Sequence, residues 1–446
     1  MMKLILFLMS IIALMLIFNK NKIYKINTHT FMVLSTMILL SMFNNTYMSW
    51  SKIYYFSGLD NLSISLIMLT IWINSLATMA FTPLKKTSNM FLITILMMTL
   101  ALVLCFSSIN MLTFYIMFES SLIPMIFIIM GWGAQIDRIQ ASMYMLFYTL
   151  LGSLPFLVTL FFLFKKLNTL SFILMYNFSN TLYSNNIFLF LSILGAFLIK
   201  LPLYFTHSWL PKAHTEAPVS GSMILAGIML KLGTYSIYRL ILIFNFINMK
   251  FSFIIISVSL VGSIYCSLMC LNQMDMKIIV AYSSIVHMNF SLASLFMANS
   301  WGFKGTLWMM IAHGLCSSAL FFLVNLNYER THSRLIIFNK GLINILPSLS
   351  MWWFLICVSN FGAPPSMNLL SEIILIKSIL SKSNLNLVMV FFIPLLSTLY
   401  SILLFSSQHG KFFNTMNFKM ISVKEFLIIL LHWTPLNLIF MNLLLF

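Results

Sequence analysis

The residues that could do chemistry in this sequence are ionisable side chains inside long apolar stretches. A charge near the centre of a bilayer costs about 2.5 to 3.5 kcal/mol on insertion scales, so such residues usually have a functional reason to be there. Carboxyl, amine and imidazole groups are also the side chains that take up and release protons. We therefore predict a proton-transfer path formed by Glu119, Lys200, Lys231, His287, His313 and Glu372.

The centre of this path is the stretch from Leu198 to Tyr238, which holds Lys200 and Lys231 on either side of a polar link. Pro202 closely follows Lys200, and a proline breaks a helix and leaves backbone carbonyls without their usual donors. We expect such carbonyls to receive the Lys200 ammonium. The link contains three further polar residues, which either help protons enter or only cap helix ends: His207, His214 and Glu216.

Each member of the path also has a plainer interpretation, which the residues alone leave open. Glu119, in NMLTFYIMFESSLIPM, could be a protonated acid that only joins helices, although a neighbouring lysine would let it ionise. Lys200 could snorkel to a membrane interface on its long side chain, and so, less readily from its greater depth, could Lys231. The two histidines could be hydrogen-bonded links between helices, and Glu372 could contribute only to packing near an interface.

The elements that position these residues follow from the composition. Of 446 residues, 61% are hydrophobic and 7% are charged, and the mean hydropathy is +1.00, which indicates a polytopic membrane protein. Polar or Pro/Gly-bearing breaks give about fourteen apolar stretches, most of them near the ~20 residues that span a bilayer as a helix. They begin near residues 3, 29, 62, 90, 111, 141, 187, 218, 251, 278, 302, 345, 385 and 425. We predict an all-α fold.

Two of the predicted helices are broken in comparable ways. The seventh is interrupted by Pro202, and the twelfth by Gly362, Pro364 and Pro365 just before Glu372. Paired broken helices in two halves of a chain are typical of transporters built from inverted repeats. The sequence predicts three N-terminal helices in 1–88, a first five-helix repeat in 89–249, a second in 250–408, and a C-terminal loop and helix in 409–446.

Several functions are disfavoured by what the sequence lacks. The formal net charge of +17 fits the positive-inside signal of membrane loops, and no basic patch with interleaved aromatic residues indicates nucleic-acid binding. No phosphate-binding glycine loop and no histidine pair at haem spacing is present. The five cysteines lie inside apolar runs without a zinc or iron–sulfur pattern. We expect no cofactor, no metal and no redox chemistry in this chain.

Longer motifs give a resemblance that covers essentially the whole chain. The segment HSWLPKAHTEAPVSGSMILAGIMLKLGTY at 207–235 resembles the hallmark of the antiporter-like membrane subunits of respiratory complex I, the NADH:ubiquinone oxidoreductase, and of related multi-subunit cation/proton antiporters. Three further features are similar to the chain 4 branch of that family in mitochondria: WGAQIDRIQASMYMLFYTLLGSLP at 132–155, NYERTHSR at 327–334, and an acid at position 372.

This resemblance implies fourteen helices, two inverted five-helix repeats and a central hydrophilic axis for proton translocation. The six residues of the path match the family's coupled pair (Glu119 and Lys200), central lysine (Lys231), connecting groups (His287 and His313) and exit acid (Glu372). The resemblance further implies NADH, FMN, iron–sulfur clusters and ubiquinone in partner subunits. It implies contacts with other membrane and accessory subunits and with lipids that include cardiolipin, and a multi-pass location in the mitochondrial inner membrane.

The function that we predict is proton movement across that membrane, driven by NADH-to-ubiquinone electron transfer in other chains. Proximity of Lys200 would favour ionised Glu119, and separation of the pair would neutralise Glu119 and let Lys200 act on Lys231. Two alternatives stay open from the sequence: a stand-alone cation/proton antiporter, and a purely structural membrane subunit.

Overall fold

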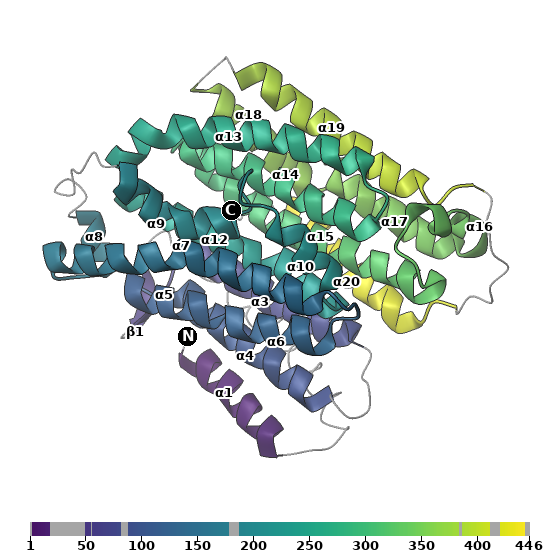
Figure 1. Cartoon of the computed structure of the whole chain (residues 1–446), viewed down its shortest axis with the longest axis horizontal. Helices are drawn as coiled ribbons and strands as arrows, with labels where there is room; N and C mark the ends of the chain where they lie inside the picture. The colour runs from purple at the N-terminus through teal and green to yellow at the C-terminus, as the bar shows by residue number, and fades with distance from the viewer. Residues whose placement is uncertain are drawn as a thin grey trace. The chain divides into compact units, whose positions relative to one another are not determined.

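The fold comes from a computed structural model, which describes residues 2–17, 50–54, 56–81, 88–177, 187–382, 386–410 and 420–441. These residues are almost entirely helical (Figure 1). A chain in hydrocarbon must satisfy its backbone N–H and C=O groups internally, and an α-helix does this within one segment. The all-α prediction is confirmed. One small antiparallel hairpin, of strands β1 (Ser51–Tyr54) and β2 (Ser57–Leu59), was not predicted.

Ten described helical segments are long and apolar enough to cross a membrane, or up to eleven if one bent pair counts as a span. The fourteen predicted helices all coincide with described helices except the one expected from about residue 29, which lies outside the described residues. The polytopic membrane architecture is therefore confirmed. The ten segments are Asn61–Ala80, Asn89–Ser107, Met111–Trp132, Arg138–Leu167, Val219–Ile243, Phe251–Asn272, Met276–Phe296, Ser300–Thr331, Leu387–Ser406 and Val423–Phe440.

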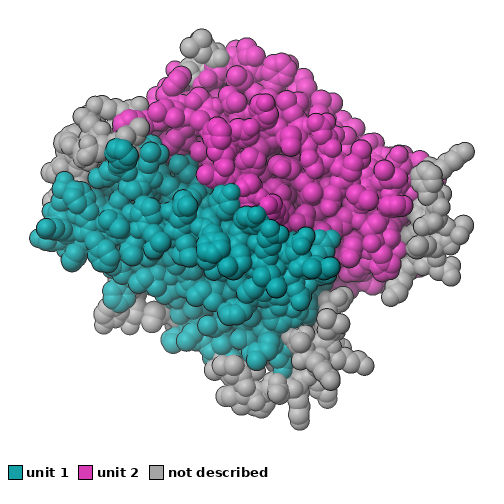
Figure 2. Space-filling view, viewed as in Figure 1, with its two compact units in different colours: residues 1–200, 216–224, 235–247 teal, residues 201–215, 225–234, 248–446 magenta. Residues whose placement is uncertain are grey.

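The first of two compact units comprises Met1–Lys200, Glu216–Ile224 and Tyr235–Ile247 (Figure 2). Within it α7 packs against α6 and α9, and α4 packs against α3 and α5. Its helices are α1 (Met2–Ile17), α3 (Asn61–Ala80), α4 (Ser88–Ser107), α5 (Met111–Ser120), α6 (Leu122–Trp132), α7 (Arg138–Leu167), α8 (Phe172–Asn177), α9 (Ile187–Lys200), α11 (Val219–Ile224) and the later part of α12 (Leu230–Ile243).

The second unit comprises Leu201–Thr215, Leu225–Thr234 and Asn248–Phe446 (Figure 2). Its long helix α15 packs against α14, α17, α18 and α20 (Figure 1). Its elements are α10 (Trp209–Glu216), the π-helix η2 (Leu225–Met229), the start of α12, α13 (Asn245–Asn272), α14 (Met276–Phe296), α15 (Ser300–Thr331), the 3₁₀-helix η3 (Ile336–Asn339), α16 (Leu342–Ile345), α17 (Pro347–Asn360), α18 (Met367–Leu380), α19 (Leu387–Ser406) and α20 (Val423–Met441). The predicted boundaries at 88, 249 and 408 and the inverted repeats stay predictions.

Both predicted helix breaks are present. Helix α9 ends at Lys200, and turns occupy 201–208 before α10 begins. Helix α17 ends at Asn360, and α18 begins at Met367 after the stretch that contains the two prolines. The breaks place Lys200 at the last position of one helix and Glu372 in the second turn of another.

The helices differ in how much of their surface is buried. Helices α7 and α19 carry many exposed apolar side chains, such as Phe147, Leu151, Val158 and Phe391, as expected of surfaces that meet lipid hydrocarbon. Helices α14 and α15 are buried along most of their length. The two histidines of the predicted path, His287 and His313, therefore lie on helices shielded from the surface.

Candidate functional site

Lys231 lies in the first turn of α12, directly after the π-helix η2. Single π-helical turns inside α-helices occur frequently at functional sites. The Lys231 Nζ donates to the Ala226 carbonyl, five residues back, at 2.7 Å and lies 2.8 Å from His313 Nδ1 on α15. The side chain has no exposed surface. Lys231 is therefore held by two polar partners in the interior and does not reach out to an interface.

His313 and His287 continue this line of polar groups from α15 to α14. An ammonium group can only donate, so His313 Nδ1 accepts whenever Lys231 is charged, and the ring then carries its proton on Nε2. The centroids of the His313 and His287 rings are 5.7 Å apart, and both side chains are buried. Two imidazole rings thus follow the buried lysine.

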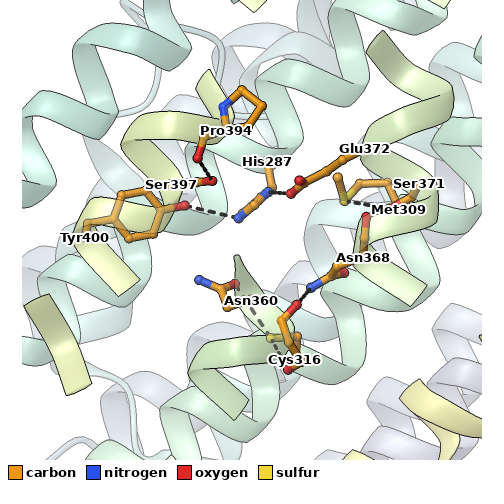
Figure 3. A network of polar contacts seen from close by, with 11 residues as sticks. His287, Met309, Cys316, Asn360, Asn368, Ser371, Glu372, Pro394, Ser397 and Tyr400 are labelled. Carbon is orange, nitrogen blue, oxygen red and sulfur yellow. Dashed lines mark hydrogen bonds and ion pairs between the residues drawn. The ribbon is translucent and has the colours of Figure 1, made fainter. Parts of the chain in front are cut away.

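His287 has polar neighbours at both ring nitrogens (Figure 3). Its Nδ1 lies 3.5 Å from Glu372 Oε1 on α18, and its Nε2 lies 3.1 Å from the Tyr400 hydroxyl on α19. Tyr400 was missed by the sequence analysis, because a tyrosine in the apolar helix LLSTLYSILL carries no signal that separates it from a packed aromatic residue. The structure therefore adds one hydroxyl to the predicted set.

Glu372 is positioned by the break between α17 and α18. Gly362, in this break, has φ +75°, and a Cβ built there would lie 3.0 Å from Glu372 Oε2. The Asn368 side-chain amide donates to the Ser359 carbonyl at 2.7 Å and so joins the two helix ends. Glycine at 362 both permits the left-handed backbone and leaves room for the carboxylate.

Four of the six predicted residues therefore form one line in the second unit, which we call the Lys–His–Glu axis: Lys231, His313, His287 and Glu372. Each of the three steps along it joins side chains on different helices: Lys231 to His313 at 2.8 Å, the two histidine rings at 5.7 Å between centroids, and His287 to Glu372 at 3.5 Å. The residues come from positions 231 to 372, so tertiary packing and not local sequence brings them together.

The other two predicted residues, Glu119 and Lys200, are electrostatic neighbours within the first unit. No N–O contact within 4 Å joins them among the ion pairs of the described residues. Instead Lys200 Nζ donates to the Phe118 carbonyl at 3.3 Å and lies 3.4 Å from the centroid of the Phe118 ring. That carbonyl belongs to the last turn of α5 and also accepts from the Ser121 hydroxyl at 2.7 Å. The expectation that the Pro202 break supplies this acceptor was wrong.

The Glu119 carboxyl group has one oxygen, Oε1, that is buried without a hydrogen-bond partner. Ser153 of α7 lies beside this carboxyl group. The neighbouring Gly152 allows α7 and α9 to approach closely, because a Cβ there would be 2.8 Å from both Ala196 Cα and Ile199 Cδ1. This close approach keeps Ser153 and the end of α9 near the acid.

The three residues of the polar link have different surroundings. His207 is half-buried with its ring stacked on Tyr204, and burial lowers the pKa of its imidazole. His214 is fully buried and stacked on Phe321 at 4.4 Å, and neither of its ring nitrogens has a hydrogen-bond partner. Glu216 is the last residue of α10 and belongs to the first compact unit, whereas His207 and His214 belong to the second. A role of these residues in proton uptake stays a prediction.

A buried ion pair in the first unit was also missed. Arg239 of α12 makes two short contacts with Asp60, Nη1 to Oδ2 at 2.6 Å and Nη2 to Oδ1 at 2.7 Å. Burial by itself would raise the pKa of the Asp60 carboxyl, but the Arg239 guanidinium and hydrogen bonds with Ser63 hold it below its ordinary value. The partners lie 179 positions apart, a separation that a single sequence does not connect.

The fold and the axis define a class: helical membrane proteins that carry linked titratable side chains in their interior. The family described as NADH:quinone oxidoreductase/Mrp antiporter matches residues 108–398, and the family described as NADH-ubiquinone oxidoreductase chain 4, amino terminus, matches residues 1–105. The chain is 45% identical to NADH-ubiquinone oxidoreductase chain 4 of Ceratitis capitata and 44% identical to that of Aedes aegypti, each over 98% of both chains.

A solved structure has the same fold. A chain of respiratory complex I from Thermus thermophilus with bound NADH aligns with a TM-score of 0.85 at 22% identity, over 97% of this chain and 94% of that one. The protein belongs to the NADH-ubiquinone oxidoreductase chain 4 family. The resemblance seen in the sequence motifs is thereby confirmed.

Proposed function

We propose that this chain is a proton-translocating, antiporter-like core subunit of respiratory complex I in the mitochondrial inner membrane. Its family membership supports the assignment to the complex. The observation that carries the proton-transfer role is the Lys–His–Glu axis, in which a lysine, two histidines and an acid follow one another inside the protein. Packing alone does not require ionisable groups in that place.

The mechanism rests on coupled titration. Addition of a proton to one member of the axis changes the charge felt by the next, and in an interior of low dielectric that change is large enough to move the next proton. Lys231, His313 and His287 can each accept and release a proton, and Glu372 receives it last. The Glu119 and Lys200 side chains form a second titratable pair, whose separation would trigger this sequence.

The chain contributes proton transfer and not electron transfer in this proposal. NADH, FMN, iron–sulfur clusters and ubiquinone belong to partner subunits. Within the described residues no group of three or more His, Cys, Asp or Glu side chains could hold a metal ion. Contacts with other membrane and accessory subunits and with lipids such as cardiolipin are part of the same proposal.

The test is proton pumping by complex I that carries Glu119→Gln or Lys231→Ala. Both variants should assemble into the complex on native gels, with NADH dehydrogenase staining, and should pump far fewer protons per NADH. Full pumping with unimpaired coupling would leave only a structural role. Purification of the chain alone with cation/proton exchange activity would instead support a stand-alone antiporter.

A further inference from the structure

Tyr400 is a fully buried residue that the family assignment and the sequence motifs leave without a role. It lies on α19, a largely apolar helix, and its hydroxyl is 3.1 Å from His287 Nε2. A buried tyrosine hydroxyl usually finds a hydrogen-bond partner, and here that partner belongs to the Lys–His–Glu axis. Figure 3 shows the hydroxyl on one side of the His287 ring and Glu372 on the other.

This arrangement restricts how the His287 ring can lie. With Nε2 bonded to the Tyr400 hydroxyl, Nδ1 faces Glu372 Oε1 at 3.5 Å. The bond at one ring nitrogen determines the orientation and the protonation of the other. A ring rotated by 180° about its Cβ–Cγ bond would turn Nδ1 away from the carboxylate and lose both contacts.

The hydroxyl is a partner for His287 in each of its protonation states. When the ring is neutral with its proton on Nδ1, the Tyr400 O–H donates a hydrogen bond to Nε2. When Nε2 carries a proton, the hydroxyl oxygen accepts a hydrogen bond from the Nε2–H group. Transfer from the imidazolium to the Glu372 carboxylate moves the Nδ1 proton and leaves a neutral ring with its proton on Nε2 and a neutral acid. Tyr400 can keep its bond before and after this step, and phenylalanine cannot.

From this geometry we propose that Tyr400 is a positioning residue for proton exchange between His287 and Glu372. It holds the ring so that the exchange passes through Nδ1. The inference rests on the proposed function of the chain, because it concerns one step of the axis. It predicts that loss of one hydroxyl group slows this step without disturbing the packing of α19.

The test compares complex I that carries Tyr400→Phe with the wild type and with Tyr265→Phe. Tyr265 is a half-exposed tyrosine on α13, and it is not among the described contacts of His287, so its variant removes a hydroxyl without removing a bond to that ring. Proton-coupled NADH:ubiquinone turnover of Tyr400→Phe should fall about ten-fold, as expected when a buried ring nitrogen loses its hydrogen bond. Turnover is expressed per assembled complex on native gels, so a loss of assembly alone does not count.

The solvent isotope effect provides the readout that a structural role would not change. If exchange at His287 becomes rate-limiting in Tyr400→Phe, turnover in D₂O should fall further relative to H₂O than it does for the wild type. Wild-type turnover and isotope effect in Tyr400→Phe would overturn the inference. Glu372→Gln, measured alongside, separates the two claims: unchanged pumping in Glu372→Gln refutes the proposed function, whereas loss in Glu372→Gln with normal Tyr400→Phe refutes only the role of Tyr400.

Discussion

Substitution of Gly362 by alanine should impair proton transfer while the complex still assembles. A Cβ at this position would lie 3.0 Å from Glu372 Oε2 and 3.4 Å from Leu369 Cα, so the carboxylate must shift by a few tenths of an ångström. The residue also has φ +75°, and an alanine in the left-handed region costs about 1 to 2 kcal/mol. That cost is well below the roughly 5–15 kcal/mol that stabilises a folded domain.

The shift matters because the contact with His287 is already long. Glu372 Oε1 lies 3.5 Å from His287 Nδ1, whereas proton transfer needs a donor–acceptor distance of about 2.6 to 3.2 Å. We expect the rate of coupled proton pumping to fall about ten-fold, which corresponds to a barrier increase of about 1.4 kcal/mol. The assay is NADH-driven acidification of sealed vesicles, with assembly measured on native gels.

Gly131→Ala is the matched control for this experiment. Gly131 lies in α6, and a Cβ there would meet no atom within 4 Å. Its variant should assemble and pump as the wild type does. If Gly362→Ala pumps as well as Gly131→Ala, then the break between α17 and α18 does not set the position of the Glu372 carboxylate, and the reasoning is refuted.

Two further predictions concern the first unit. Asp60→Asn leaves the Arg239 guanidinium buried without its counter-charge and should destabilise the complex by about 3 to 5 kcal/mol. The double variant that also carries Arg239→Met should recover this stability. Equal thermal stability of the single and the double variant by calorimetry would exclude a structural ion pair. Because the pKa of Asp60 in the folded state lies below its ordinary value of 3.8, this stabilisation is present above that pH and is lost as the pH falls through the lowered pKa. Gly152→Val should push α7 away from Ala196 of α9 and reduce proton pumping more than Gly131→Ala does; normal pumping would show that this close approach is not needed.

Much of the fold follows from the sequence because the bilayer restricts what a chain can do. Apolar stretches of bilayer length form helices, and a proline removes a backbone donor from such a helix, so the breaks after Lys200 and Asn360 could be predicted. Proline alone does not decide the matter, since Pro155 and Pro394 lie inside unbroken helices. The hairpin β1–β2 could not, since its strands have only four and three residues and form no long pattern.

The residues of the site could be predicted where burying them in a membrane costs much free energy. Lysine, histidine and glutamate stand out in apolar helices, and the structure places Lys231, His313, His287 and Glu372 in one line. Tyr400 does not stand out in the sequence, because the aromatic ring of a tyrosine packs well among apolar side chains. The π-helix before Lys231 was missed too, since the stretch LAGIM carries no local signal for a wider helical turn.

The ratio of protons translocated to electrons transferred, measured in sealed vesicles with complex I that carries Glu372→Gln, tests the role of the axis most directly. Glutamine keeps the size of the side chain and removes the proton acceptor, and Asp137→Asn, an exposed acid in a loop, serves as the control. We predict a clear fall in this ratio for Glu372→Gln and the wild-type ratio for Asp137→Asn. A wild-type ratio in Glu372→Gln would contradict it.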